Sequence, residues 1–309
     1  MGKKVEIKSR FYIICSAAVA FIVFILDTIF LYVSPISAKP DEIIYFKEAM
    51  YILITVCMYM HFRSTHDVTL TIHGALKQIF SSLLFITLIY FIYLAINFFE
   101  GPVFETGDEG ETLILNFNTV IGVNVISYTV LYFFTRIVYL MKILIYYKRK
   151  RNTAFFFRSF ILLMLLTSFV FLVQKEKISF DMDDQNIFNL ILFWTTIFSL
   201  IVLALRNRWV TYLTRKEKWL YFLISLAVIL YFQFILFEQV LGGDGFKNIQ
   251  AQSNIAYSLV FFTYYFLLAY TLSSMLSMLF HLPTARVFDR KMREVQSLHN
   301  LSSAINSEP

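Results

Sequence analysis

Charged residues are scarce in this sequence. Asp, Glu, Lys and Arg make up 16% of its 309 residues, against roughly 25% in typical soluble domains. Hydrophobic residues make up 58% and aromatic residues 18%. This composition indicates that lipid covers much of the apolar surface, so it points to a membrane protein and away from an ordinary soluble domain.

Cysteine is also rare. Cys15 and Cys57 each lie inside an apolar run, with no CxxC pattern and no Cys/His cluster. Nothing here resembles a disulfide framework or a thiolate metal site. We interpret both residues as small apolar side chains within helices.

Catalytic and cofactor motifs are missing. The sequence has no GxSxG, HExxH or GxxxxGK[ST] pattern and no protein-kinase set. His66 and His73 would lie about 10 Å apart along a helix, too far for one metal ion, which prefers histidines at i and i+4. We therefore expect no catalytic residue, no metal and no cofactor here, and no enzyme activity within these residues.

Long apolar runs dominate what is present. Runs of about 20 apolar residues predict membrane-spanning helices, and the sequence holds about eight of them. The expected fold is an all-α polytopic membrane helix bundle. The predicted spans cover, approximately, residues 11–33, 43–62, 79–99, 120–146, 155–173, 187–205, 219–238 and 255–280.

The distribution of Lys and Arg predicts the orientation. Loops on the cytoplasmic side carry the excess of positive residues, and placing the N-terminus inside puts 22 of the 27 cations there. Both termini are then cytoplasmic, and the net charge of +6 is an asymmetry across the membrane and not a nucleic-acid surface. The cations left outside are Lys39, Lys47, Lys175, Lys177 and Lys247.

Three segments follow from this topology. Residues 1–10 are the cytoplasmic N-terminus, residues 11–282 the eight-span membrane domain and residues 283–309 a cytoplasmic linker helix. The first apolar run reaches about 23 residues, longer than the 7–15 of a cleaved signal peptide. An uncleaved anchor is the better interpretation.

Asp27 and Arg136 form a possible polar site within the membrane. Asp27 lies deep in the first apolar run, where burying a charge costs about 2.5–3.5 kcal/mol, so it should face the bundle. It is either a proton or cation ligand or, as we favour, a carboxyl bonded to a neighbouring helix. Arg136 either extends toward the cytoplasmic interface or pairs within the bundle, and an ion pair with Asp27 is conceivable.

The C-terminal segment has the pattern of a helix that needs a partner. Pro283 should end or kink the last span, and Thr284 can cap a new helix from about Ala285 to Ile305. The spacing of its apolar positions is close to a heptad, with an additional three-residue step. A single helix of this length is marginal in water, so it needs a partner: a second copy, an inner loop or a following domain. We expect a parallel homodimer, which would supply that partner. The apolar positions are Phe288, Met292, Val295, Leu298, Leu301 and Ile305.

Three stretches of this segment carry a resemblance: "LPTA" at 282–285, "DRKMREV" at 289–295 and "SLHNLSSAI" at 297–305. Together they resemble the linker that joins a multi-span region to a cytoplasmic GAF domain in bacterial membrane signalling proteins. In such proteins the output is commonly a SpoIIE-like serine/threonine phosphatase or a histidine kinase. The resemblance covers about thirty residues, and the GAF body and output motifs are not among them.

The resemblance implies a function outside these residues. We expect a sensor and transducer module of the bacterial cytoplasmic (inner) membrane, which passes a stimulus through the last span to a cytoplasmic output. Its expected partners are a second copy, that output domain or protein, and the bilayer. The alternative is a small-solute or ion transporter or channel, which would need several bundle-facing polar groups or broken helices near mid-membrane.

Overall fold

The computed structural model describes residues 2–33, 41–65, 71–100, 104–105, 112–113, 117–147, 152–174, 178, 186–231, 233 and 253–305. Helices form nearly all of this part of the chain, because a lipid-covered backbone must satisfy its own hydrogen bonds. The elements are α1 (Gly2–Val33), α2 (Asp41–Thr65), α3 (Ile72–Glu100), β1 (Phe104–Glu105), β2 (Thr112–Leu113), α4 (Phe117–Tyr146), α5 (Thr153–Val173), α6 (Ile187–Ala204), η2 (Arg208–Tyr212), α7 (Arg215–Tyr231) and α9 (Asn254–Ile305).

The predicted all-α membrane bundle is confirmed. Within the described ranges, seven helical segments are long and apolar enough to cross a membrane, so the chain is a multi-pass membrane protein. The eighth predicted span, 219–238, begins in α7 and continues beyond Tyr231 into residues that mostly lie outside the described ranges. The seven segments are Lys8–Ile29, Glu42–Thr65, Ile72–Ile89, Asn124–Tyr146, Thr153–Val173, Ile187–Thr211 and Asn254–Phe280.

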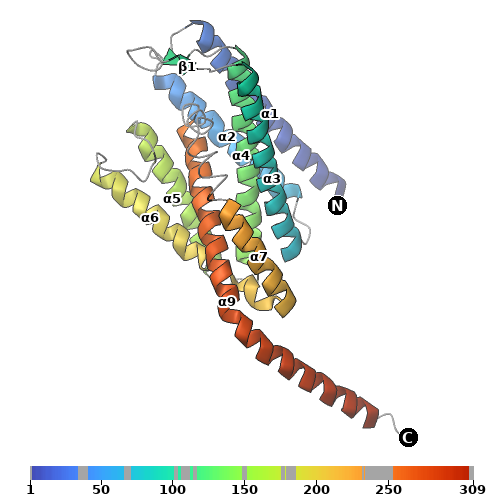
Figure 1. The fold of residues 1–309 in the computed structure, drawn as a ribbon. Helices are drawn as coiled ribbons and strands as arrows, with labels where there is room; N and C mark the ends of the chain where they lie inside the picture. The colour runs from blue at the N-terminus through green and yellow to red at the C-terminus, as the bar shows by residue number, and fades with distance from the viewer. Residues whose placement is uncertain are drawn as a thin grey trace.

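Successive long helices run in opposite directions, so the bundle has two distinct ends (Figure 1). At one end α1 begins and α9 leaves the bundle; we call it the basic end, because the Lys- and Arg-rich helix termini gather there. At the other end lies a short antiparallel hairpin in which Phe104 pairs with Leu113 and Glu105 with Thr112. We call this the hairpin end. The two chain termini lie toward the same end, as the topology prediction requires.

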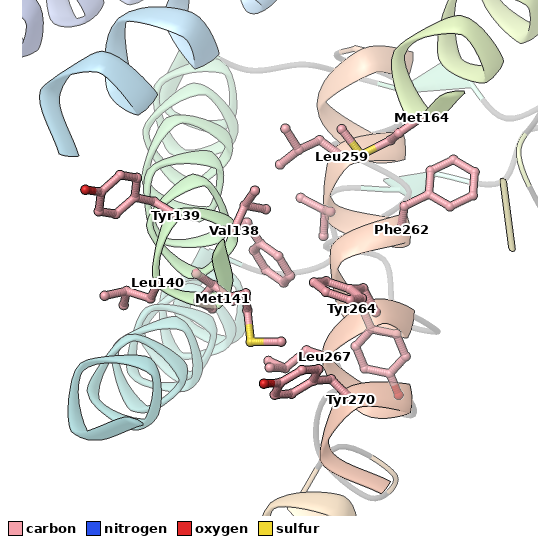
Figure 2. Packing of buried hydrophobic residues seen from close by; sticks show 14 of the residues in the cluster. Val138, Tyr139, Leu140, Met141, Met164, Leu259, Phe262, Tyr264, Leu267 and Tyr270 are labelled. Atoms are coloured by element: carbon pink, nitrogen blue, oxygen red, sulfur yellow. The ribbon is translucent and has the colours of Figure 1, made fainter. Parts of the chain in front are cut away.

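α4 and α9 form the centre of the bundle. In their spanning segments 61% and 67% of the residues are buried, against 22% in α1 and 28% in α2. Figure 2 shows Val138 and Met141 on the side of α4 that faces α9, and both belong to one buried cluster with Tyr264 and Leu267 of α9. A movement of α9 would therefore change its packing against several other helices.

α9 continues past the point where the sequence predicts a helix boundary. It is one helix of 52 residues, of which the spanning segment takes 27. Pro283 does not end it, and no separate helix begins at Ala285; α9 bends where it leaves the bundle, and its tail extends away from the other helices (Figure 1). A proline inside a helix removes one backbone hydrogen bond and favours such a bend without stopping the helix. The end at Ile305 agrees with the prediction.

The predicted boundary between residues 10 and 11 also lies within a helix. α1 begins at Gly2, so residues 2–10 continue directly into the first span. Ser9 is buried and is hydrogen-bonded to Thr65 near the end of α2, with 2.7 Å between the two hydroxyl oxygens. His61 Nδ1 lies 2.9 Å from the Ser9 carbonyl oxygen. The basic N-terminal turns are thus joined to α2.

Candidate functional site

The first turn of α9 is capped by a carboxylate from another helix. Glu48 of α2 is buried, at 4% exposure. Its carboxylate accepts hydrogen bonds from the Ser253 hydroxyl (2.6 Å) and from the backbone N–H groups of Asn254 (2.6 Å) and Ile255 (3.2 Å). Ser253 Oγ in turn accepts from the Ala256 N–H at 3.1 Å.

This arrangement satisfies groups that a helix cannot satisfy by itself. The first N–H groups of a helix have no partner within it, and the helix dipole favours a negative charge at that end. Ser253 acts as the N-cap, and Glu48 supplies the remaining acceptor atoms from a position 205 residues earlier in the chain. We call Glu48 and residues 253–255 the α9 clasp.

The residue before Glu48 ties α2 to α1 and α4. Lys47 Nζ lies 2.7 Å from Asp27 Oδ1 in an ion pair whose side chains are 12% and 8% exposed. Asn124 Nδ2 donates to the other carboxylate oxygen of Asp27 at 3.1 Å. The α9 clasp and the ion pair are therefore adjacent, and together they join α1, α2, α4 and α9 at the hairpin end.

Asp27 and Arg136, the two residues of the predicted polar site within the membrane, have different surroundings in the structure. Asp27 faces the bundle, as expected of a charge in an apolar span, and is bonded to α2 and α4. Arg136 Nη2 donates to Gln78 Oε1 of α3 at 3.4 Å. Asp27 is bonded near the end of α1, whereas Gln78 lies near the start of α3, at the opposite end of the bundle. Asp27 and Arg136 therefore do not form the ion pair that the sequence left open.

Near the basic end, α9 is held again by the segment that follows α6. Trp209 Nε1 donates to the Tyr270 hydroxyl at 2.8 Å, and both side chains are buried. Asn207 Nδ2 donates to Ser273 Oγ at 3.1 Å. α9 is therefore fixed by polar contacts at its start and again before it leaves the bundle.

The six apolar positions of the C-terminal helix, which we expect to relay the signal, all lie in the part of α9 beyond the bundle. Val295 is 62% exposed, so the tail presents at least one large apolar side chain to its surroundings. The positions concerned are Phe288, Met292, Val295, Leu298, Leu301 and Ile305.

A second group of polar side chains lies at the basic end of a lateral cavity that extends toward the start of α9. Its volume is about 810 Å³, and it is lined by α2, α4, α5 and the start of α9. We call it the α2/α5 groove. Arg63, Lys142 and Arg158 contribute its positive side chains. A smaller cavity of about 390 Å³, lined by α3, α4, η2, α7 and α9, includes Lys77 and His73.

Metal-ligating side chains do not gather anywhere in the described ranges, where no group of three His, Cys, Asp or Glu residues could hold an ion. Cys15 and Cys57 are free thiols on neighbouring helices, with 3.8 Å between their sulfur atoms. The polar sites of this part of the chain are thus built from ion pairs, hydrogen bonds and cations.

Comparison of the chain with protein-family models, with curated proteins and with solved structures finds no match in any of the three. Its function must therefore be argued from the residues themselves.

Proposed function

We propose that this chain is the membrane sensor and transducer module of a bacterial signalling protein. A stimulus acting on the bundle passes through α9 to a cytoplasmic output that these residues do not contain. By the resemblance of residues 282–305 to linkers before GAF domains, that output would be a serine/threonine phosphatase or a histidine kinase. The module itself would have no catalytic role and would lie in the bacterial cytoplasmic membrane.

The observation that carries the proposal is the continuity of α9. A helix of 52 residues is about 78 Å long at 1.5 Å per residue, more than twice the roughly 30 Å of the bilayer core. It begins at the α9 clasp, forms the centre of the bundle and extends well beyond it (Figure 1). Because the helix is unbroken from the clasp through the bend at the edge of the bundle, a shift or rotation at its start would displace the tail.

The clasp gives a physical point of input. Glu48 and Lys47 are adjacent on α2, so a displacement of α1 or α4 acts through Asp27 and Lys47 on the residue that holds the start of α9. Two packings of the bundle with different positions of α2 would give two positions of α9. A stimulus that favours one packing would select the corresponding position of the tail.

The tail requires a second helix to convert such a shift into a signal. Its apolar positions follow a near-heptad spacing with one additional three-residue step, which would overwind or shift a two-helix contact. In a parallel homodimer, two copies of this irregular seam could pack in two registers of similar free energy. Val295, one of the positions of the proposed seam, is exposed in the single chain and so is available to a second copy.

Disulfide crosslinking in bacterial membranes tests both parts of the proposal. Single cysteines replace Leu298 or Leu301 in a Cys15→Ala, Cys57→Ala background, and Ser297→Cys, adjacent but off the seam, is the matched control. We expect intersubunit crosslinks from the two seam positions and little from the control. Equal crosslinking at all three positions, or none at any, would contradict the dimer.

The relay is tested by adding Glu48→Gln to each seam cysteine variant. The amide keeps the shape of the side chain but weakens the clasp, so the ratio of crosslinking at Leu298→Cys to that at Leu301→Cys should change. Glu42→Gln, an exposed glutamate on the same helix, is the control. If the ratio is the same with and without Glu48→Gln in a folded protein, α9 does not transmit changes at its start.

A further inference from the structure

We infer that the α2/α5 groove binds one anionic phospholipid, with the lipid phosphate held at the basic end by Arg63, Lys142 and Arg158 and an acyl chain lying along the apolar wall. This inference is independent of the role of the tail, since it rests only on the groove. The chemical class recognised is a lipid phosphate with long hydrocarbon chains whose headgroup carries no positive group to offset the phosphate charge.

The cations of the groove come from three different helices. Arg63 lies on α2 two residues before its end, Lys142 near the end of α4 and Arg158 in the second turn of α5. All three line the same cavity. Among the described residues, none of them contacts a carboxylate. Like charges that converge without an acid repel one another, and an anion removes that repulsion.

Lys142 is positioned by aromatic side chains. Its Nζ donates to the Tyr59 hydroxyl at 2.8 Å and lies 5.4, 5.7 and 5.8 Å from the ring centroids of Tyr59, Tyr139 and Tyr146. These distances are within the range of cation–π attraction. The rings stabilise the ammonium group without neutralising it, and the group has donors beyond the one that Tyr59 accepts.

The rest of the groove has the length and polarity of an acyl chain site. From Arg63 back to Ile52, α2 rises about 16 Å, close to the thickness of one leaflet of hydrocarbon, about half of 30 Å. On α2 the lining alternates the apolar Ile52, Val56 and Met60 with Thr55 and Tyr59, and the lining as a whole is far more apolar than polar. The apolar lining residues include Ile52, Val56, Ile161, Leu162, Leu165 and Leu259.

The groove is open toward the lipid. Val56 of α2 is 50% exposed, and Leu162 and Leu165 of α5 are 64% and 43% exposed, although all three also line the cavity. A lipid can therefore enter sideways from the leaflet without passing through the bundle. A free phosphate ion could bind the cations but would leave the apolar wall of the groove exposed. A lipid covers both parts, which is why we infer that the occupant is a lipid.

The occupied groove would contact the helix at the centre of the bundle. Ile255, Ser258 and Leu259 of α9 line its deeper end, close to the α9 clasp. Tyr139 and Val138 of α4 belong to the same lining. Lipid in the groove therefore supports the packing of α4, α5 and α9.

The experiment uses the full chain in detergent micelles with added phosphatidylglycerol, phosphatidylcholine of the same acyl chains, or inorganic phosphate. Native mass spectrometry counts the retained lipid, and thermal unfolding reports its effect. We expect preferential retention of phosphatidylglycerol and a rise in Tm with that lipid only. Equal retention of the two lipids, or the same rise in Tm with phosphate alone, would overturn the proposal.

Substitutions locate the site. Arg63→Gln and Arg158→Gln should each weaken phosphatidylglycerol binding about fivefold, the effect of one basic residue near an anionic lipid surface. Lys77→Gln removes a cation from the smaller cavity at the same end and should leave binding unchanged. An equal loss with Lys77→Gln would show a general effect of charge and contradict the groove.

A further pair tests the apolar wall without changing any charge. Leu165→Trp fills the groove, whereas Leu166→Trp, at 44% exposure on the adjacent position, does not line it. We expect at least a fivefold loss of phosphatidylglycerol retention in the first variant and none in the second. If both variants retain the lipid equally, the acyl chain does not lie in this groove.

Discussion

At the hairpin end of the bundle, Asp27 is paired with Lys47 and Glu48 receives three hydrogen bonds around the first turn of α9. At the basic end, Arg63 and Arg158 line a cavity and contact no carboxylate of the described residues. Buried charges are tolerated when they are paired with one another and hydrogen-bonded. The first end is therefore arranged to hold helices together, whereas the second has positive charge available for something outside the chain.

The difference predicts opposite results for substitutions at the two ends. Asp27→Ala should have the largest effect, because it leaves the Lys47 ammonium nearly buried without its carboxylate. Breaking a buried ion pair in this way costs about 3–5 kcal/mol. Unfolding by sodium dodecyl sulfate in mixed micelles, followed by tryptophan fluorescence, measures the change in the free energy of unfolding.

The double variant Asp27→Leu, Lys47→Met sharpens this prediction. It removes both charges, so most of the lost stability should return, since a well-packed apolar pair often replaces a buried ion pair at little cost. If the double variant is as unstable as the single one, the effect of Asp27 comes from its packing or from Asn124 and not from the ion pair.

Glu48→Ala should come next, with a loss of about 3 kcal/mol, because the backbone N–H groups of Asn254 and Ile255 lose their acceptor in a buried place. The same micelle unfolding assay applies. Glu42→Ala, on an exposed position of α2, is the control and should change stability by less than about 0.5 kcal/mol. A similar loss in both variants would mean that the clasp does not stabilise the start of α9.

Arg63→Gln and Arg158→Gln test the same comparison at the basic end. In micelles without anionic lipid, each should leave the free energy of unfolding within about 0.5 kcal/mol of the wild type or raise it slightly, because each removes repulsion and no ion pair. A loss as large as that of Asp27→Ala would show that these cations have structural partners, and the two ends would then be alike.

The sequence predicts the elements of this molecule better than their connections. Long apolar runs leave the backbone only helices, and alternation of those helices places both termini toward one end. The apolar run around Asp27 also predicts that this side chain faces the bundle. The same run does not predict that Lys47 of the next helix is its partner.

Other features depend on contacts between distant positions or on small differences in free energy. Nothing near Glu48 in the sequence indicates that it caps a helix 205 residues later, and nothing near Lys142 indicates that Tyr59 faces it. Pro283 costs one hydrogen bond, and the helix continues because its neighbours still bond on either side. The structure also shows a capping box at the start of α7, in which Thr214 and Glu217 bond to each other; the spacing Thr-x-x-Glu is a local signal that our sequence analysis did not use.

This capping pattern carries the smallest predicted effect. Glu217 accepts hydrogen bonds from the Thr214 backbone N–H at 2.8 Å and from its hydroxyl at 2.9 Å, and His73 Nε2 lies 3.2 Å from its carboxylate. These contacts hold the pKa of Glu217 below its ordinary value. A lowered folded-state pKa contributes stability above the unfolded value, and this contribution is lost as the pH falls through the lowered value. Because the side chain is 34% exposed, the contribution should be under about 1 kcal/mol.

Unfolding between pH 6 and pH 3 should therefore show a slightly smaller loss of stability in Glu217→Gln than in the wild type, with Glu42→Gln matching the wild type. If Glu217→Gln and the wild type lose the same stability over that range, the carboxylate does not stabilise α7 at the basic end.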